Sequence, residues 1–288
     1  MTHDFHHRVL TANGVPLHIV EAGAADRPLV ILLHGFPEFW FGWRELIGPL
    51  ADAGYRVVAP DQRGYNLSGK PKGARAYGLD VLAADIFALA DALGHERFSV
   101  VGHDWGAAVG WWMASLPAGR ARLERMAILN APHPAIWRRS MTEDAEQRRK
   151  SRYVQALRLP ILPELLVRAG GYKALADAFA SSTRREAFGP AEMAAYRAAW
   201  SQPGAVSGMI NWYRALFLQA LPVPAAGSLA TPTLIVWGDR DAFAGPELAE
   251  ASAALCAEAR VLHLPEATHW VAHDAPDEVS AALLGFLG

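Results

Sequence analysis

The clearest chemical feature of the chain is an aspartate placed between two glycines. The motif Val101-Gly102-His103-Asp104-Trp105-Gly106 follows a short apolar run and precedes a helical pattern. Glycines at this spacing permit the sharp strand-to-helix turn known as a nucleophile elbow, which exposes its central side chain. An aspartate that only caps the next helix would not call for glycine on both sides. We therefore predict that Asp104 is a nucleophile.

The aspartate also selects a type of substrate. A serine that attacks an sp³ carbon forms an ether, which water does not cleave under mild conditions. A carboxylate that attacks the same carbon forms an ester, which water can hydrolyse. Because Asp104 stands where serine is usual, we expect electrophiles such as epoxides or alkyl halides rather than ordinary esters or amides.

Partners for this nucleophile follow later in the chain, in the order acid and then base that a nucleophile elbow predicts. Asp239 and Asp241 come directly after an apolar run, and Asp241 is the preferred acid with Asp239 as the fallback. His269 follows the last predicted strand and is the candidate base, with His273 as a less favoured neighbour. Oriented by Asp241, His269 would activate the water that hydrolyses the ester.

Hydrolysis of an ester passes through an oxyanion, which needs hydrogen-bond donors. The candidates are the backbone N–H groups of Phe36 and Trp105. Phe36 lies in His34-Gly35-Phe36-Pro37, directly after an apolar run, where the second donor of such a site is expected. The tight turn also favours a cis peptide bond before Pro37.

Apolar runs and helical spacing alternate along most of the chain. This alternation predicts an α/β fold with a mostly parallel sheet and helices on both faces. The predicted strands cover 16–22, 28–33, 55–59, 98–101, 125–129, 232–237 and 260–264. The predicted helices cover 79–93, 106–116 and 276–287.

The strand pattern is interrupted between 132 and 224. This stretch contains eight prolines and several short helical patterns, but no convincing core strand. We expect it to be an all-helical cap, or lid, inserted into a core domain made of residues 1–131 and 225–288. Two independent domains are less favoured, because the strands after 224 are too few to form a sheet of their own.

Composition excludes several classes of function. Hydrophobic residues make up 52% of the 288-residue chain, which has a formal net charge of −2. We therefore expect a folded protein that binds neither nucleic acid nor an acidic membrane surface. The chain has one cysteine and no uncharged apolar run of membrane-spanning length, so we expect no membrane partner and a cytoplasmic location. Neither metal-ligand spacing nor a phosphate loop is found, so no cofactor is expected; the protein could be a monomer or a homodimer.

Three motifs together resemble a known family. The runs 34–44 (HGFPEFWFGWR), 59–65 (APDQRGY) and 102–106 (GHDWG) are similar to the soluble epoxide hydrolase branch of the α/β-hydrolases, which is related to the haloalkane dehalogenases. The similarity extends from about residue 8 to the end. It implies an α/β-hydrolase fold with a helical cap, and conversion of a small apolar epoxide and water to a vicinal diol.

The resemblance further implies two tyrosines in the cap that donate to the epoxide oxygen. They correspond to Tyr153, which precedes the turn at Pro160, and to Tyr213 in Asn211-Trp212-Tyr213-Arg214. A phenol suits this role because its pKa of about 10 keeps it neutral at pH 7 yet lets it release a proton. The substrate pocket is expected to include His34, Pro37, Trp40, Trp212 and Trp270.

Related activities remain as alternatives. A haloalkane dehalogenase would use the same triad with Trp105 as a halide donor and Trp40 as a conceivable second one. A fluoroacetate dehalogenase would need arginine where Trp105 and Ala108 stand. Some proteins of this fold carry their catalytic acid directly after the fourth predicted strand. Position 130 is asparagine here, so that arrangement is excluded. A non-catalytic receptor of the same fold is a minor alternative.

Overall fold

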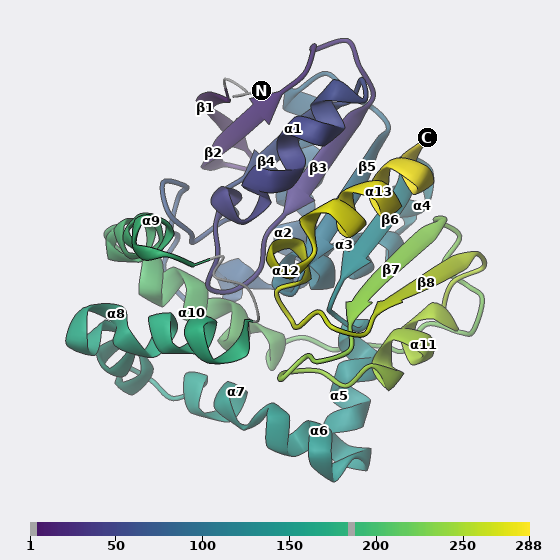
Figure 1. Cartoon of the computed structure of the whole chain (residues 1–288). Helices are drawn as coiled ribbons and strands as arrows, with labels where there is room; N and C mark the ends of the chain where they lie inside the picture. Colours follow the sequence, from purple (N-terminus) through teal and green to yellow (C-terminus); the bar gives the residue numbers. More distant parts are fainter. Residues whose placement is uncertain (1–4, 184–187) are drawn as a thin grey trace.

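The computed structural model describes residues 5–183 and 188–288 of the chain. Its framework is one sheet of eight strands in the order β1-β2-β4-β3-β5-β6-β7-β8 (Figure 1). β2 pairs antiparallel with β1 and β4, and the strands from β4 to β8 pair in parallel. The strands are β1 His6–Ala12, β2 Val15–Ala22, β3 Leu29–Leu33, β4 Arg56–Pro60, β5 Phe98–His103, β6 Leu123–Leu129, β7 Thr233–Gly238 and β8 Ala259–Leu264.

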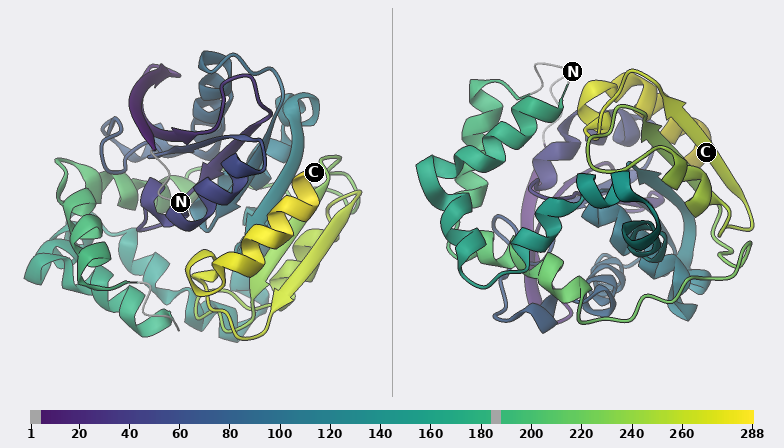
Figure 2. Two further views of the ribbon diagram at one scale, coloured as in Figure 1. Left: turned by 45° about the horizontal axis from the view of Figure 1, so that its top comes forward. Right: turned by 90° about the horizontal axis from the view of Figure 1, so that it is seen from below.

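The sheet separates two hydrophobic cores, and strand β3 contributes to both. Leu29 and Ile31 pack on one side with helices α2 (Leu79–Ala92) and α3 (Trp105–Ser115). Val30 packs on the other side with α1 (Arg44–Asp52) and α13 (Pro276–Leu287). Figure 2 shows these helices covering opposite faces of the sheet. This burial on both faces explains why the central strands are continuous apolar runs.

Between β6 and β7 the described residues form helices and no strand. These helices lie together at the C-terminal ends of the parallel strands (Figure 1). They are α5 Pro134–Glu143, α6 Ala145–Lys150, α7 Arg152–Leu157, α8 Leu162–Ser182, α9 Pro190–Ser201 and α10 Ala205–Leu216. Helix α8 changes direction at 169–172, where Gly170, Gly171 and Tyr172 all have positive φ.

The remaining short elements complete the connections of the sheet. They are η1 Trp40–Trp43, η2 Ala74–Tyr77, α4 Pro117–Arg122, α11 Glu247–Ala253 and α12 Val271–Asp274. No helix in the described part of the chain is long and apolar enough to cross a membrane. Within the same residues, no group of three or more histidine, cysteine or acidic side chains could hold a metal ion.

Candidate active site

Asp104 stands at the sharp corner between β5 and α3. Its backbone has φ +50° and ψ −117°, a conformation that a residue with a side chain rarely adopts. The corner is tight enough to require the flanking glycines. A Cβ atom on Gly102 would lie 2.6 Å from the backbone of Ala107, and one on Gly106 would lie 1.9 Å from the carbonyl oxygen of Leu33. The elbow therefore presents the Asp104 carboxylate above the end of the sheet.

The two carboxylate oxygens of Asp104 have different surroundings. Oδ1 accepts a hydrogen bond of 2.7 Å from the backbone N–H of Phe36. Oδ2 lies 3.7 Å from Nε2 of His269. The peptide bond between Phe36 and Pro37 is cis, as the sequence led us to expect. One oxygen is thus held by the backbone while the other faces the histidine.

His269 is fixed by a buried aspartate. Its Nδ1 donates to Oδ2 of Asp241 over 2.7 Å. The same carboxylate accepts hydrogen bonds from the backbone N–H groups of Phe243 (2.6 Å) and Ala244 (3.0 Å), and from the side-chain amide of Asn130 (2.8 Å). Because Nδ1 is committed to Asp241, Nε2 is the nitrogen that points toward Asp104.

His269 and Asp241 shift each other's pKa, and each shift opposes the effect of burial. Burial would lower the pKa of His269, but Asp241 and, less strongly, Asp104 raise it to about 9. Burial would raise the pKa of Asp241, yet His269 and the hydrogen bonds from Phe243 and Asn130 hold it below its ordinary value. With a pKa of about 9, His269 is protonated at neutral pH, and it lies between Asp241 and Asp104.

Asp239, the alternative acid, lies in a different environment. Its Oδ1 contacts Nδ1 of His263 at 2.5 Å, in a pair that is partly exposed. Asp241 is the aspartate in contact with His269, whereas Asp239 pairs with a histidine of β8.

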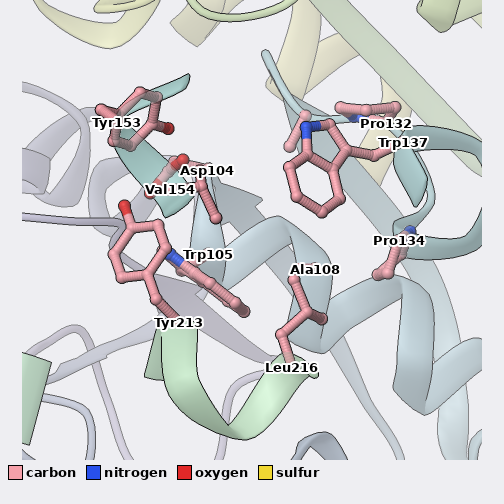
Figure 3. Close-up of a pocket in the computed structure, with 11 residues that line it drawn as sticks. Asp104, Trp105, Ala108, Pro132, Pro134, Trp137, Tyr153, Val154, Tyr213 and Leu216 are labelled. Atoms are coloured by element: carbon pink, nitrogen blue, oxygen red, sulfur yellow. The ribbon is translucent and has the colours of Figure 1, made fainter. Parts of the chain in front are cut away.

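Tyr153 of α7 and Tyr213 of α10 lie beside Asp104 (Figure 3). Their rings meet edge to face with centroids 6.1 Å apart. Tyr153 is 37% exposed as a whole residue, whereas its hydroxyl is desolvated. Desolvation is the main cause that raises the pKa of both phenols, and the negative charge of Asp104 adds to it. Both hydroxyls are therefore neutral at pH 7 and available as donors.

Two cavities meet at these three side chains, since Asp104, Tyr153 and Tyr213 line both. The smaller has a volume of about 90 Å³ and the larger about 310 Å³. The other residues of the smaller cavity include Trp105, Ala108, Ala131, Pro132, Pro134, Trp137, Val154 and Leu216. Those of the larger include Phe36, Pro37, Ala156, Leu157, Val167, Ala174, Leu175, Ala178, Phe243, His269 and Trp270. Among the described residues that line the two cavities, the ionisable groups are Asp104, His269 and the two phenols.

Three residues expected to line the pocket do not border either cavity. His34 is buried behind the turn, where Nδ1 contacts the carbonyl oxygen of Gly35 and Nε2 accepts from the backbone of Gln62. The indole N–H of Trp212 donates to the carbonyl oxygen of Arg63. The ring of Trp40 packs against Phe5 and His7. Aromatic character alone did not distinguish these packing roles from a place in the pocket.

A second buried group, which the sequence did not reveal as a site, is centred on Glu38. Its Oε1 accepts from the hydroxyl of Tyr196 (2.7 Å) and contacts Nε2 of His273 (2.7 Å), and its Oε2 contacts Nδ1 of His103 (3.1 Å). Nε2 of His103 lies 2.8 Å from the carbonyl oxygen of His269. Burial opposes the charge on Glu38, but the two histidines keep the pKa of Glu38 well below its ordinary value. Glu38 thus joins helix α9 to the loops of Asp104 and His269.

The motif at 59–65 packs against the segments that carry Phe36 and Tyr213. Gln62 donates through its side-chain amide to the carbonyl oxygen of His34 (2.5 Å). Arg63 forms a buried ion pair with Asp85 at 2.6 Å. Gly64 lies so close to Gly208 of α10 that a Cβ atom on Gly208 would come within 2.4 Å of the carbonyl oxygen of Gly64. The motif therefore holds both the Phe36 turn and the helix that carries Tyr213.

Comparison with known proteins agrees with this architecture. The family model described as alpha/beta hydrolase fold matches residues 28–276. The AB hydrolase superfamily protein YfhM of Bacillus subtilis (strain 168) is 41% identical, with 96% of each chain covered. Epoxide hydrolase 4 of Homo sapiens is 36% identical over 96% of this chain and 76% of the human protein.

The chain is also similar to solved structures of epoxide hydrolases. An epoxide hydrolase from metagenomes of hot environments superposes with a TM-score of 0.85 at 36% identity, covering 100% of this chain and 99% of the other. The epoxide hydrolase of Bacillus megaterium in complex with an inhibitor has a TM-score of 0.86 at 29% identity, covering 97% and 99% of the two chains. The chain is therefore a hydrolase of the α/β-hydrolase family and belongs to its epoxide hydrolase branch.

Proposed function

We propose that the protein converts an apolar epoxide to a vicinal diol through an ester on Asp104. The observation that carries the proposal is the meeting of one carboxylate and two phenols, Tyr153 and Tyr213, where the two cavities join. An epoxide placed there has a carbon near the carboxylate and its oxygen near the phenols. Its substituents extend into the apolar cavities on either side.

In the first step Oδ2 of Asp104 attacks a ring carbon, and the bond between that carbon and the epoxide oxygen breaks. Phe36 holds Oδ1, which leaves Oδ2 for the attack. The oxygen leaves as an alkoxide and takes a proton from Tyr153 or Tyr213. Although the pKa of each phenol is raised, an alkoxide is a stronger base than a phenolate, so this transfer remains favourable.

In the second step His269 removes a proton from water, and the hydroxide attacks the carbonyl carbon of the ester. The resulting oxyanion lies where the N–H of Phe36 donates, and we assign the N–H of Trp105 as the second donor. On collapse, the ester oxygen that leaves takes the proton that His269 removed from water, and the diol is released. Asp104 is then in its acid form and returns its proton to the phenolate, which restores the carboxylate and the phenol. Asp241 orients His269 and stabilises its positive charge during this step.

We further propose residues 132–224 as a cap domain on a core formed by 1–131 and 225–288. Tyr153 and Tyr213 lie in the proposed cap, whereas Asp104, Asp241 and His269 follow strands of the core. Substrate binding between the two would exclude water from the first step and leave only the molecule that His269 activates.

A haloalkane dehalogenase is the alternative, because Trp105 borders the smaller cavity beside Asp104. Two observations favour the epoxide. Halide release needs no proton donor, yet two phenols stand beside the nucleophile. Trp40, the conceivable second halide donor, packs away from both cavities.

The direct test is a parallel assay of styrene oxide and chlorobutane with the wild-type protein, Tyr213→Phe, and the Tyr153→Phe/Tyr213→Phe double variant. We expect diol from styrene oxide and no chloride release. Removal of one phenol should slow the epoxide reaction by about 10²-fold, and the double variant should be nearly inactive, because no acid remains for the alkoxide. Chloride release that survives in the double variant would establish the dehalogenase, and turnover of neither substrate would favour the receptor.

A further inference from the structure

The start of helix α8 and the turn that precedes it carry an unusual concentration of exposed apolar side chains. Ten large hydrophobic residues are exposed among the described residues, and five of them fall between 159 and 166. Their exposed fractions range from 49% to 71%. This apolar patch consists of Leu159, Ile161, Leu162, Leu165 and Leu166. Surface leucines normally occur singly, so such a cluster marks a binding surface.

The apolar patch rests on a well-ordered base. Beneath it, Glu164 is buried and forms an ion pair of 2.6 Å with Arg214, which also donates to the carbonyl oxygen of Leu159 over 2.5 Å. Ile161 projects at the tip with φ +65°, a value that a β-branched residue seldom adopts. These contacts hold the apolar side chains outward instead of letting them fold against the protein.

Positive charge surrounds the patch. Residues 145–173 contain seven lysines or arginines and two glutamates, a local net charge of +5 in a chain whose total is −2. Of the two glutamates, Glu164 is buried under Arg214 and Glu146 pairs with Arg149. Arg152, Arg158 and Arg168 are exposed on α7, on the following turn and on α8.

A groove extends this basic surface next to the patch. Arg138, Arg148 and Arg152 line it together with Met141, Thr142, Gln155 and Phe217. The guanidinium of Arg158 lies 3.8 Å from the centre of the Phe217 ring. Arg158 therefore connects the arginine groove with the first residue of the apolar patch, and the two form one continuous surface.

We propose that this surface docks on an anionic phospholipid membrane, with the apolar patch inserted between headgroups and the arginines bound to phosphate. The combination of projecting leucines and a cationic surround is what an interfacial membrane site requires. A second copy of the chain fits less well. A two-fold contact would place each patch on itself and bring the exposed arginines of both copies together.

If the protein acts on epoxides as proposed, docking through this surface would place the active site close to its substrate. Leu157 and Val167, at the two ends of the patch, line the larger cavity from the inside, together with the exposed Ala156 and Ala174. An apolar epoxide concentrates in the membrane rather than in water. Docking through the patch would bring the entrance of the larger cavity to the membrane surface.

The sequence had led us to expect no acidic membrane partner, because the net charge of the whole chain is close to zero. That average conceals the uneven distribution of charge along the chain. The excess of acidic residues lies outside 145–173, so the rest of the molecule does not attract an anionic surface.

The test is sedimentation of the full-length protein with vesicles of phosphatidylcholine alone, or of phosphatidylcholine and phosphatidylglycerol in equal parts. We expect binding to the mixed vesicles that weakens with added salt. Leu165→Ser/Leu166→Ser and Arg152→Gln/Arg168→Gln should each weaken it by about tenfold or more. The matched controls, Val9→Ser/Leu67→Ser and Arg27→Gln/Arg260→Gln, change exposed residues elsewhere and should bind like the wild type.

Several results would overturn the proposal. If equal amounts of protein sedimented with both kinds of vesicle, anionic lipid would have no part in binding. If the patch variants bound vesicles as well as the control variants do, the membrane contact would lie on another part of the surface. A dimer in analytical ultracentrifugation that Leu165→Ser/Leu166→Ser dissociates, without any vesicle binding, would assign the patch to a second copy. Because none of these measurements uses turnover, they are independent of the proposed reaction.

Discussion

At the level of single residues, the protonation of His269 would link the two steps of the proposed reaction. In the resting site the pKa of His269 is raised to about 9, in part by the negative charge of Asp104. Esterification removes that charge. The pKa of His269 should therefore fall during the reaction, so that the histidine becomes a base only after the ester has formed.

This coupling predicts a pH dependence that differs between the two steps. A group with a raised pKa is protonated below that value, and its basic form grows as pH rises. The hydrolysis step should accelerate by about tenfold per pH unit and level off below pH 9, whereas ester formation should change little over the same range. Single-turnover quench-flow with styrene oxide measures both. A hydrolysis rate that falls with rising pH would contradict the role of His269 as base.

Much of the residue-scale arrangement followed from motif and chain order. The glycines around Asp104 indicated the elbow, and the order of the later residues brought forward Asp241 and His269, which the structure places in contact with each other. The sequence could not show which tryptophans face the cavities, because Trp40 and Trp212 satisfy the same motifs while packing elsewhere.

At the scale of elements, the group centred on Glu38 connects helix α9 with the loops of Asp104 and His269. Nε2 of His103 faces a carbonyl oxygen and its Nδ1 faces Glu38. The ring of His103 therefore links Glu38 to the backbone of His269. Loss of the Glu38 carboxylate would disturb this link and with it the loop of His269. Glu38 is thus a positioning residue.

We predict that Glu38→Gln slows ester hydrolysis by about tenfold and leaves ester formation nearly unchanged, because a buried charge-assisted contact is worth about 1.5–3 kcal/mol. The substitution also removes a charge that contributes to the raised pKa of His269, so the pH profile of hydrolysis should move to lower pH. Tyr196→Phe, which removes one hydrogen bond to Glu38, is the control and should not move that profile. A profile unchanged in Glu38→Gln would leave Glu38 a purely structural role.

The elements themselves were predictable where one physical signal dominated. Strands buried on both faces, such as β3, are continuous apolar runs, and α13 matches its predicted bounds. β1 was missed because most of its side chains are exposed, so its sequence lacks an apolar pattern. α1 was also missed, and it contains Pro49. The group around Glu38 joins residues distant in the chain, which no local pattern connects.

At the scale of the whole molecule, two cavities of unequal size lie beside Asp104, between the sheet and the helices that connect β6 to β7. The smaller, about 90 Å³, is below the roughly 150 Å³ of a cavity known to accept benzene. The larger, about 310 Å³, exceeds it. The preferred substrate should therefore carry a small alkyl group on one side of the ring and an aryl or longer alkyl group on the other.

This asymmetry predicts that trans-β-methylstyrene oxide is hydrolysed at least about tenfold faster, in kcat/KM, than trans-stilbene oxide. Trp137→Ala enlarges the smaller cavity and should reduce the difference. Leu157→Ala enlarges only the larger one and serves as the control. Comparable rates for the two epoxides with the wild-type protein would show that the cavities do not set this preference.

Whether Asp104 becomes esterified to a substrate carbon is tested most directly by a single turnover of styrene oxide in ¹⁸O-labelled water with enzyme in excess. Because water would attack the carbonyl carbon of the ester, we predict ¹⁸O in the peptide that contains Asp104 and an unlabelled diol. Mass spectrometry of the digested protein and of the product gives both quantities. An ¹⁸O-labelled diol together with an unlabelled Asp104 would show that water attacks the epoxide directly and that no ester forms on Asp104.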